Sequence, residues 1–387
     1  MIAAPRVLFV TRRFWPLAND NMWRLLALAD ALQTNGWQPQ ILTAQWHSAW
    51  PEKVELRDLA IQRLGPSPTT PFRSRRYVRG VCEWTNNHAG LFDCIVIDAT
   101  EEDAVALTLR SMRDAPPVIV RYDTVESGGP LMERLHQRIV TACSQAAHVV
   151  VPHQHAQREL VSAGVALTKI SIIADGPYRK IDCEPVARGQ ARRALADINY
   201  ELALRADDRL CICPCEMNRA AGLELLARAL GTVLESRRDA RCWILGDGPE
   251  RGRMVELLRR EGWHSDILMP GTFEDLELIF QAADLCVLPG ASHGLSWIMP
   301  TALTNGLTTL VCDSPAARSR LGLNSCPILF EQGNTQQLCQ KVESVLDHPK
   351  SWRAATQAAA EPFQLSPSPI AQWLRLIRQF ERSGRDA

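Results

Sequence analysis

Short apolar runs alternate with longer amphipathic stretches along nearly the whole chain. Runs such as Val7–Thr11 and Cys94–Asp98 are typical of buried strands. The stretch Met22–Asn35 carries leucine and alanine at helical spacing and ends before a glycine, as helices often do. This order of strand and helix is the pattern of parallel β/α units, so the sequence predicts an α/β fold.

The pattern runs twice, and the interruption lies at Tyr178–Gly189, where Pro, Asp and Gly are scattered. A chain of 387 residues is long enough for two domains. We expect two Rossmann-like, doubly wound domains facing each other across a cleft, because ligands of such sheets bind beyond the carboxyl ends of the strands. The expected boundaries are an N-terminal domain at residues 1–180, a C-terminal domain at 181–365, and a final helix at 366–387 that packs back on the first domain.

The individual elements follow from the same periodicities. The expected strands are residues 7–11, 40–43, 94–98, 118–122, 148–151 and 170–173 in the first half, and 209–214, 241–245, 267–269, 285–288, 307–312 and 328–329 in the second. The expected helices are residues 22–35, 132–146, 223–234, 250–261, 274–283, 300–305, 335–346, 352–360 and 369–382.

The balance of charge argues against a nucleic-acid partner. The chain has 43 Lys plus Arg and 43 Asp plus Glu, so no net charge draws it to a polyanion. No window is long and apolar enough to span a bilayer, and peripheral membrane association is left open. One local cluster of arginines is interpreted as a solvated loop. It consists of Arg73, Arg75, Arg76 and Arg79.

Most of the 12 cysteines lie inside the predicted strands, where a free cysteine behaves as a small hydrophobic residue. Arg6, Arg12 and Arg13 interrupt the only apolar run near the start, so no signal peptide is predicted. Both features favour a reducing, cytoplasmic compartment, with the inner face of the membrane left open as a location.

A turn of sequence Gly246-Asp247-Gly248-Pro249 follows one predicted strand and precedes a predicted helix. Glycines allow a tight turn and a close approach of a ligand to the backbone, and the helix start offers N–H groups to an anion. A plain turn between strand and helix needs no ligand. On these residues alone, the two interpretations are equally supported.

The wider context resembles the C-terminal domain of family 4 glycosyltransferases, which have the GT-B fold. The resemblance covers residues 209–346 and rests on the order of four segments. The N-terminal half is similar more loosely, through Phe14-Trp15-Pro16 after the first strand and Ile172–Gly176 between the halves. The four segments are the Gly246–Pro249 turn, Met269-Pro270-Gly271-Thr272, the strand Ala283–Pro289, and the loop and helix from His293-Gly294 to Asn305-Gly306.

This resemblance implies transfer of a sugar from a nucleotide-sugar donor with retention, without an essential metal or any cofactor beyond that co-substrate. The donor would bind the C-terminal domain, where fixed cations and N–H groups stabilise the leaving diphosphate. The acceptor would be a glycan, a lipid-linked sugar or a small molecule. Oligomeric state is not indicated. The implied donor-site residues are Arg219, Glu216, Gly246, Asp247, Gly248, Pro249, Thr272, Gly294, Leu295, Ser296 and Thr301.

The chain departs from the family where the donor is held. The family's Arg and Lys, which neutralise the diphosphate, fall on Cys215 or Glu216 and on Ala220 or Ala221. Arg219 is the cation left in this loop, and it either compensates or is an exposed loop residue. In the family's pair of glutamates spaced E-x(7)-E, His293 takes the first position and Thr301 the second. His293 either contacts the sugar or is an ordinary loop histidine.

The acceptor side is less clearly marked. The family's Gly-Gly loop after the first strand is replaced by Asn19, Asp20 and Asn21, where an asparagine either forms a similar turn or caps the following helix. Arg121 and Asp123 end a strand and are candidates for sugar or acceptor contacts, with a structural ion pair as the alternative. Trp15 is a candidate for stacking on a sugar.

Two functions therefore remain open. An active glycosyltransferase with an altered donor site is favoured by the architecture, the Gly246–Pro249 turn and Arg219. A catalytically inactive relative that acts as a scaffold or partner subunit is favoured by the missing Lys and the missing second Glu. Under the first hypothesis, His293, Asp123 and Arg121 are the catalytic candidates.

Overall fold

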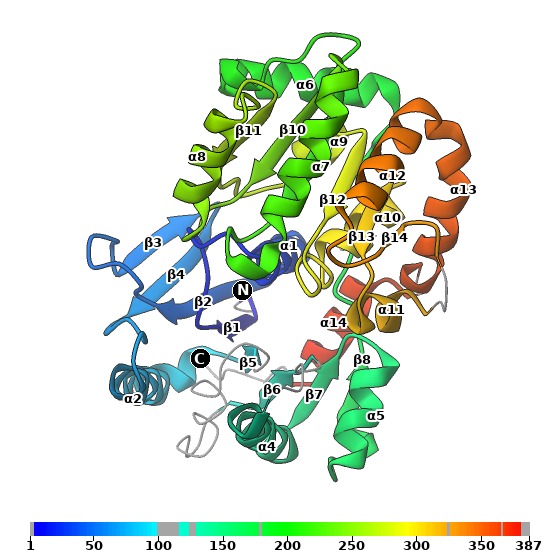
Figure 1. Ribbon diagram of the computed structural model, residues 1–387. Coiled ribbons are helices and arrows are strands. Elements are labelled where there is room, and N and C mark those ends of the chain that lie inside the picture. The colour runs from blue at the N-terminus through cyan, green and yellow to red at the C-terminus, as the bar shows by residue number, and fades with distance from the viewer. Residues whose placement is uncertain are drawn as a thin grey trace. The chain divides into compact units, whose positions relative to one another are not determined.

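The computed structural model describes residues 4–98, 116–123, 129–177, 180–322, 326–364 and 367–380 (Figure 1). Contacts between residues divide the chain into two compact units. The first contains residues 1–14, 27–174 and 367–387, and the second contains residues 15–26 and 175–366. The sequence gives no signal that residues 15–26, beside the first strand, group with the second unit.

The first unit is built on an 8-stranded sheet of order β3-β4-β2-β1-β5-β6-β7-β8. All neighbours pair in parallel except β3 with β4, and the strand order reverses between β1 and β5. The six expected strands are present, and the antiparallel β3–β4 pair is an addition that the sequence analysis missed. The bounds are β1 Arg6–Val10, β2 Gln38–Ala44, β3 Lys53–Leu56, β4 Leu59–Leu64, β5 Cys94–Asp98, β6 Val118–Arg121, β7 His148–Val151 and β8 Ile170–Ile172.

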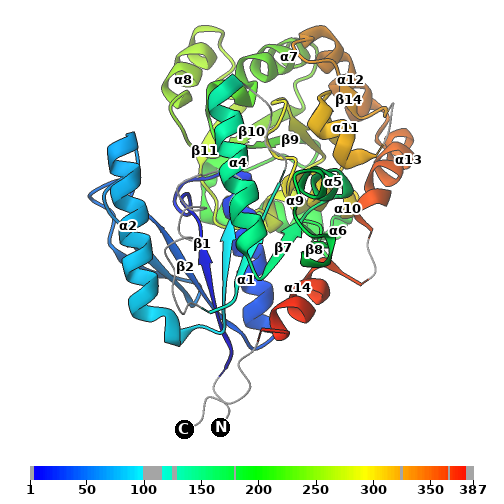
Figure 2. The same ribbon diagram turned by 90° about the horizontal axis from the view of Figure 1, so that it is seen from below.

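Helices cover this sheet and bury its apolar side chains. Tyr77 and Val81 of α2 pack with Leu8, Val10 and Ile95 of the sheet, and α2 runs along the sheet in Figure 2. The final helix, α14, groups with this unit, and the Phe380 ring beyond its end lies 6.5 Å from that of His148 in β7. The helix bounds are α1 Asp20–Thr34, which spans the division between units, α2 Pro71–His88, α4 Gly129–Gln145, α5 Gln154–Ser162 and α14 Pro369–Arg378.

The second unit is built on a 6-stranded parallel sheet of order β11-β10-β9-β12-β13-β14. Chain order reverses between β9 and β12, and such a reversal opens a crevice at the carboxyl ends of the two strands. All six expected strands are found. They are β9 Arg209–Pro214, β10 Ala240–Leu245, β11 Ile267–Gly271, β12 Leu285–Leu288, β13 Thr309–Cys312 and β14 Leu329–Phe330. The helices are α6 Pro185–Ile198, α7 Leu223–Ser236, α8 Arg251–Arg260, α9 Glu277–Ala282, α10 Ile298–Thr304, α11 Pro315–Leu321, α12 Thr335–Asp347 and α13 Pro349–Ala360.

The cysteines behave as the sequence predicts. All 12 are free thiols, and Cys211, Cys213 and Cys242 belong to the core of the second unit. Burial is the main cause that raises the pKa of the Cys286 thiol well above its usual value. These thiols are therefore packing groups rather than nucleophiles.

Two local predictions were wrong. The expected linker at residues 178–189 overlaps α6, which begins at Pro185, and its face with Ala191 and Leu195 is buried. The arginine cluster expected in a loop lies on α2, which Thr70 caps and Pro71 opens. In both cases proline marks the start of a helix rather than a break, because its missing N–H costs nothing in the first turn. No helix of the described residues is long and apolar enough to cross a membrane.

Candidate functional site

Four loops follow strands β9 to β12 at the carboxyl edge of the second sheet, and glycines let two of them touch. A Cβ on Gly246 would lie 2.0 Å from the carbonyl oxygen of Cys215, and one on Gly248 would lie 2.4 Å from that of Met217. Both glycines also have positive φ, so any other residue would strain the turn. The Gly246–Pro249 turn is thus shaped by backbone packing against the β9 loop.

The other pair of loops is equally close. A Cβ on Gly222 would lie 2.6 Å from the carbonyl oxygen of Pro289, and one on Gly290 would lie 2.7 Å from that of Ala220. The loop after β9 is therefore held between the loops after β10 and β12. This places the expected donor-site segments on one edge of one sheet, at the point where the strand order reverses.

His293 is held by a residue that the sequence analysis did not single out. Its Nε2 lies 3.1 Å from Nδ2 of Asn218, while Oδ1 of Asn218 accepts the N–H of Ala220 at 3.0 Å. Because Oδ1 is an acceptor, Nδ2 is the donor toward the imidazole. The neutral ring therefore carries its proton on Nδ1.

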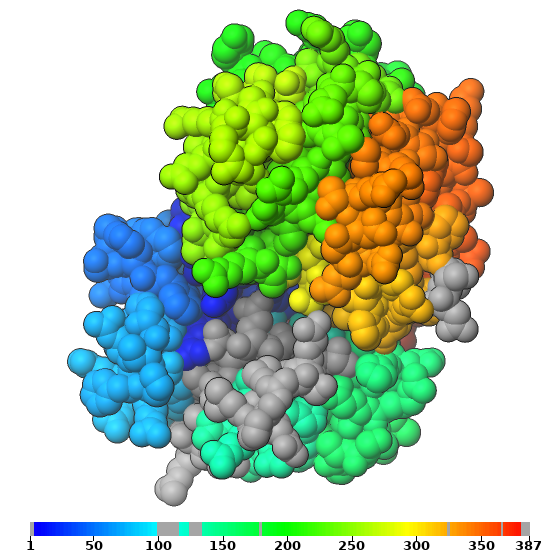
Figure 3. Space-filling model, viewed as in Figure 1, coloured from blue at the N-terminus to red at the C-terminus, as the bar shows by residue number. Residues whose placement is uncertain are grey.

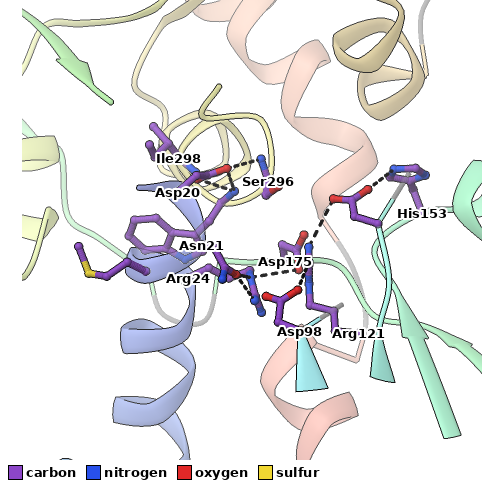
Figure 4. Close-up of polar contacts among 12 residues, drawn as sticks. Asp20, Asn21, Arg24, Asp98, Arg121, His153, Asp175, Ser296 and Ile298 are labelled. Atoms are coloured by element: carbon purple, nitrogen blue, oxygen red, sulfur yellow. Dashed lines mark hydrogen bonds and ion pairs between the residues drawn. The ribbon is translucent and has the colours of Figure 1, made fainter. Parts of the chain in front are cut away.

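The turn after Gly294 presents three consecutive backbone N–H groups, and the carboxylate of Asp20 accepts all three (Figure 4). The N–H of Ser296 donates to Oδ2 at 2.7 Å, and those of Trp297 and Ile298 donate to Oδ1 at 3.0 Å each. The sequence analysis expected this turn to face a donor phosphate. In the structure, a carboxylate from the start of α1 lies at these N–H groups.

Burial and hydrogen bonding act in opposite directions on Asp20. Burial raises the pKa of the Asp20 carboxyl above its usual value, against the lowering effects of the three backbone N–H groups and of Arg320. For this half-buried side chain, the loss of hydration disfavours the charged carboxylate, whereas the backbone hydrogen bonds favour it.

The neighbours of Asp20 fix the start of α1. Asn19 caps the helix, because its Oδ1 accepts the N–H of Met22 at 2.8 Å, which is the capping role that the sequence analysis weighed for this loop. Oδ1 of Asn21 accepts from Nε of Arg24 at 3.1 Å, and this guanidinium, 1% exposed, lies 3.9 Å from Asp175. Trp23 donates its indole N–H to the carbonyl of Phe273 at 2.8 Å.

Arg219 lies at the surface of its loop. Its side chain is 90% exposed, and its Nε lies 3.5 Å from Glu250, which follows the Gly246–Pro249 turn. It is thus beside the expected donor turn but paired with a carboxylate. An exposed ion pair of this kind contributes little to stability.

Thr301, at the second glutamate position, is 2% exposed, and Trp297 beside it is 6% exposed. Within the described residues, neither Thr301 Oγ1 nor Trp297 Nε1 has a hydrogen-bond partner. A Cβ on Gly176 would meet both side chains, at 3.0 Å from Trp297 Cδ1 and 3.3 Å from Thr301 Oγ1. The threonine hydroxyl is thus buried beneath the segment that joins the two halves of the sequence.

The first unit has its own cluster of charged side chains at the carboxyl edge of its sheet (Figure 4). Arg121, which ends β6, lies 3.5 Å from Asp98 at the end of β5 and 3.4 Å from Asp123. Nε2 of His153 lies 3.3 Å from the other oxygen of Asp123, and its Nδ1 accepts the N–H of Ala156 at 3.2 Å. Arg121 and Asp123 were predicted from the sequence. Asp98 was not, although it ends a predicted strand, and neither was His153, which has no local signal.

Comparison with known proteins gives the same assignment for the fold. Sucrose-phosphate synthase from Thermosynechococcus elongatus is 16% identical, with a TM-score of 0.69 over 97% of this chain and 98% of that one. HepE from Anabaena, in complex with UDP and glucose, is 14% identical, with a TM-score of 0.67 over 97% and 99% of the two chains. The chain has the GT-B fold.

The family match lies in the second unit. Residues 208–348 match the family Glycosyl transferases group 1. EpsF of Bacillus subtilis (strain 168), which carries a glycosyltransferase name, is 31% identical over 80 residues, and the match spans 21% of this chain and 21% of EpsF. The family match covers all four loops of the candidate site, from the β9 loop to α10.

Proposed function

We propose that this GT-B protein is a glycosyltransferase that takes its sugar from a nucleotide-sugar donor held by the second unit. The match of residues 208–348 to Glycosyl transferases group 1 carries the proposal, because it contains every loop of the candidate donor site. HepE, described in complex with UDP-glucose, supports a nucleotide sugar as the donor class. The acceptor belongs to the class of glycans, lipid-linked sugars or small hydroxyl compounds.

The chemistry of transfer assigns tasks to this chain's residues. When the sugar leaves, negative charge develops on the diphosphate, so the site needs positive charge and N–H groups aimed at it. Arg219 is the cation of the β9 loop, and turning from Glu250 toward the ligand needs only side-chain rotation because it is so exposed. His293 contacts Asn218 through Nε2 and its Nδ1 is buried, so donation from Nδ1 to a sugar hydroxyl would require this side chain to turn. We keep retention of configuration as part of the proposal, by resemblance to family 4.

Asp20 sets a condition on donor binding. Its carboxylate holds the N–H groups of Ser296, Trp297 and Ile298, and two like charges repel strongly in a half-buried site. A diphosphate at this turn must therefore displace Asp20 or meet it in the protonated form. The raised pKa of Asp20 makes protonation easier than for an ordinary aspartate.

The same contact favours a second candidate function, an inactive relative that serves as a scaffold or partner subunit. If Asp20 never leaves the turn, its carboxylate permanently replaces the ligand phosphate. The pairing of Arg219 with Glu250 would then be structural as well. The two functions differ in one measurable property, which is the affinity for a nucleoside diphosphate.

The experiment is calorimetric titration of the full chain with nucleoside diphosphates and nucleotide sugars, on wild type and Arg219→Ala. We expect one nucleotide to bind in the micromolar range and the substitution to weaken it about tenfold, or about 1.4 kcal/mol. Arg193→Ala is the matched control, because Arg193 is an exposed arginine on α6 outside these loops. Absence of binding for every nucleotide contradicts the transferase proposal and favours the scaffold.

A further inference from the structure

The first two turns of α2 display an aromatic ring among arginines. Phe72 is 76% exposed, and no other phenylalanine of the described residues is among the exposed large hydrophobic side chains. Arg73, Arg75, Arg76 and Arg79 are exposed around it. A phenylalanine ring held in water contributes no burial free energy, and here it stands among four cations.

Helical geometry places this ring and three of the arginines on one face. Residues 72, 75, 76 and 79 have the spacing i, i+3, i+4, i+7, which lines one side of an α-helix. Tyr77 and Val81 lie on the opposite side and are buried against the first sheet. The Phe72–Arg79 face therefore points away from the core that α2 covers, and Figure 3 shows the α2 segment at the surface of the molecule.

The arginines of this face are not used inside the protein. Within the described part of the chain, the three arginines of this face and the neighbouring Arg73 form no ion pair, whereas some exposed arginines elsewhere pair with carboxylates, as Arg253 does with Glu224. Glu83, one turn after Arg79, is the one carboxylate in the sequence of α2. A protein with equal numbers of acidic and basic residues thus concentrates unpaired positive charge at one helix start.

That position makes the cluster costly for the isolated protein. The N-terminal end of a helix carries partial positive charge, so cations in the first turn are unfavourable there, and the first turn of α2 holds Arg73 and no acidic residue. Arg75, Arg76 and Arg79 add repulsion among themselves. A negatively charged surface outside the protein removes both penalties.

We propose that the Phe72–Arg79 face of α2 binds the surface of an anionic lipid bilayer. Arginines bind lipid phosphates through charge-assisted hydrogen bonds, and a phenylalanine among them inserts at the boundary of headgroups and acyl chains. Charge alone would fit nucleic acid as well. The exposed ring favours the bilayer, because a duplex offers no apolar layer for a side chain at its phosphate surface.

The test is co-sedimentation of the full chain with vesicles. We expect binding to vesicles of equal parts phosphatidylcholine and phosphatidylglycerol, no binding to pure phosphatidylcholine, and weaker binding as salt rises. The double substitution Arg75→Glu with Arg76→Glu should weaken binding at least about tenfold, and Phe72→Ser should weaken it severalfold. Arg75→Lys with Arg76→Lys should retain binding, because the charge is kept.

Two controls make the outcome decisive. Arg193→Glu reverses an exposed charge on α6 and should leave vesicle binding unchanged. Circular dichroism checks that each variant is folded. Equal binding to the two kinds of vesicle overturns the proposal, as does a loss of binding in Arg193→Glu as large as that in the Arg75→Glu, Arg76→Glu variant. Binding to duplex DNA without binding to vesicles overturns it as well.

Discussion

The carboxylate of Asp20 accepts the backbone N–H of Ser296 at 2.7 Å, although the two residues are 276 positions apart in the sequence. Two further N–H groups of the same turn complete the contact. Three N–H donors to one carboxylate make an anion site, and Asp20 supplies the anion from within the chain.

Replacement of Asp20 by asparagine should strengthen the binding of a nucleoside diphosphate. The substitution removes the negative charge that competes for the N–H groups of Ser296, Trp297 and Ile298. We expect a gain of about fivefold or more, since charge repulsion at such distances is worth at least about 1 kcal/mol. Calorimetry with the best nucleotide of the panel measures it. Asp30→Asn, on the same helix but away from the turn, should change nothing. Equal affinities of wild type and Asp20→Asn would show that phosphate does not approach this turn.

Stability should depend on pH through Asp20 in a defined direction. Its pKa is raised in the folded state, so the folded protein binds more protons than the unfolded chain above about pH 3.9. The contribution of Asp20 to the free energy of unfolding is therefore greatest below that pH and falls as pH rises toward the raised pKa. Urea unfolding of wild type and Asp20→Asn at a series of pH values measures this. From about pH 3.9 up to the raised pKa of Asp20, the free energy of unfolding of Asp20→Asn minus that of wild type should increase with pH. A difference that does not change with pH would contradict the prediction.

Removal of the Arg24 side chain should destabilise the protein strongly. The Arg24 guanidinium is 1% exposed and lies against Asn21 and Asp175, which is itself 4% exposed. Arg24→Ala leaves the buried carboxylate of Asp175 without the positive charge of the guanidinium beside it. Removing one partner of a buried ion pair costs about 3–5 kcal/mol. Denaturant unfolding gives the value, and Arg193→Ala, at an exposed site, should stay within about 0.5 kcal/mol of wild type. A loss below about 1 kcal/mol would mean that water reaches Asp175.

His153 and His293 should carry their protons on opposite ring nitrogens when neutral. Nδ1 of His153 accepts the Ala156 N–H, which leaves the proton on Nε2, facing Asp123. Nε2 of His293 accepts from Asn218, which leaves the proton on Nδ1. Nitrogen-15 NMR at alkaline pH distinguishes the two tautomers, with signals assigned by His153→Asn and His293→Asn. The same tautomer at both histidines would contradict one of the hydrogen-bond assignments.

The local chemistry of the sequence determined the two sheets and the loops of the candidate donor site. Apolar runs such as Cys94–Asp98 and Arg209–Pro214 predicted the strands because a strand covered on both faces must be apolar throughout. The Gly246–Pro249 turn was predicted because only glycine accepts its backbone angles. The β3–β4 pair and helices α2, α5, α6 and α11 were missed, because the polar and proline-containing segments at the starts of these helices look like loops.

Tertiary structure alone decided which groups meet at those loops. In the sequence, Asp20 was a candidate on the acceptor side, Thr301 stood at the second glutamate position of the donor site, and His153 was not singled out. Their actual partners come from distant segments: Ser296 for Asp20, Gly176 for Thr301 and Asp123 for His153. Periodicity and turn chemistry report only on neighbours in sequence, whereas these contacts depend on how the chain brings strand ends and loops together in space. The elements were therefore readable from the sequence, and the occupant of the anion site at Ser296 was not.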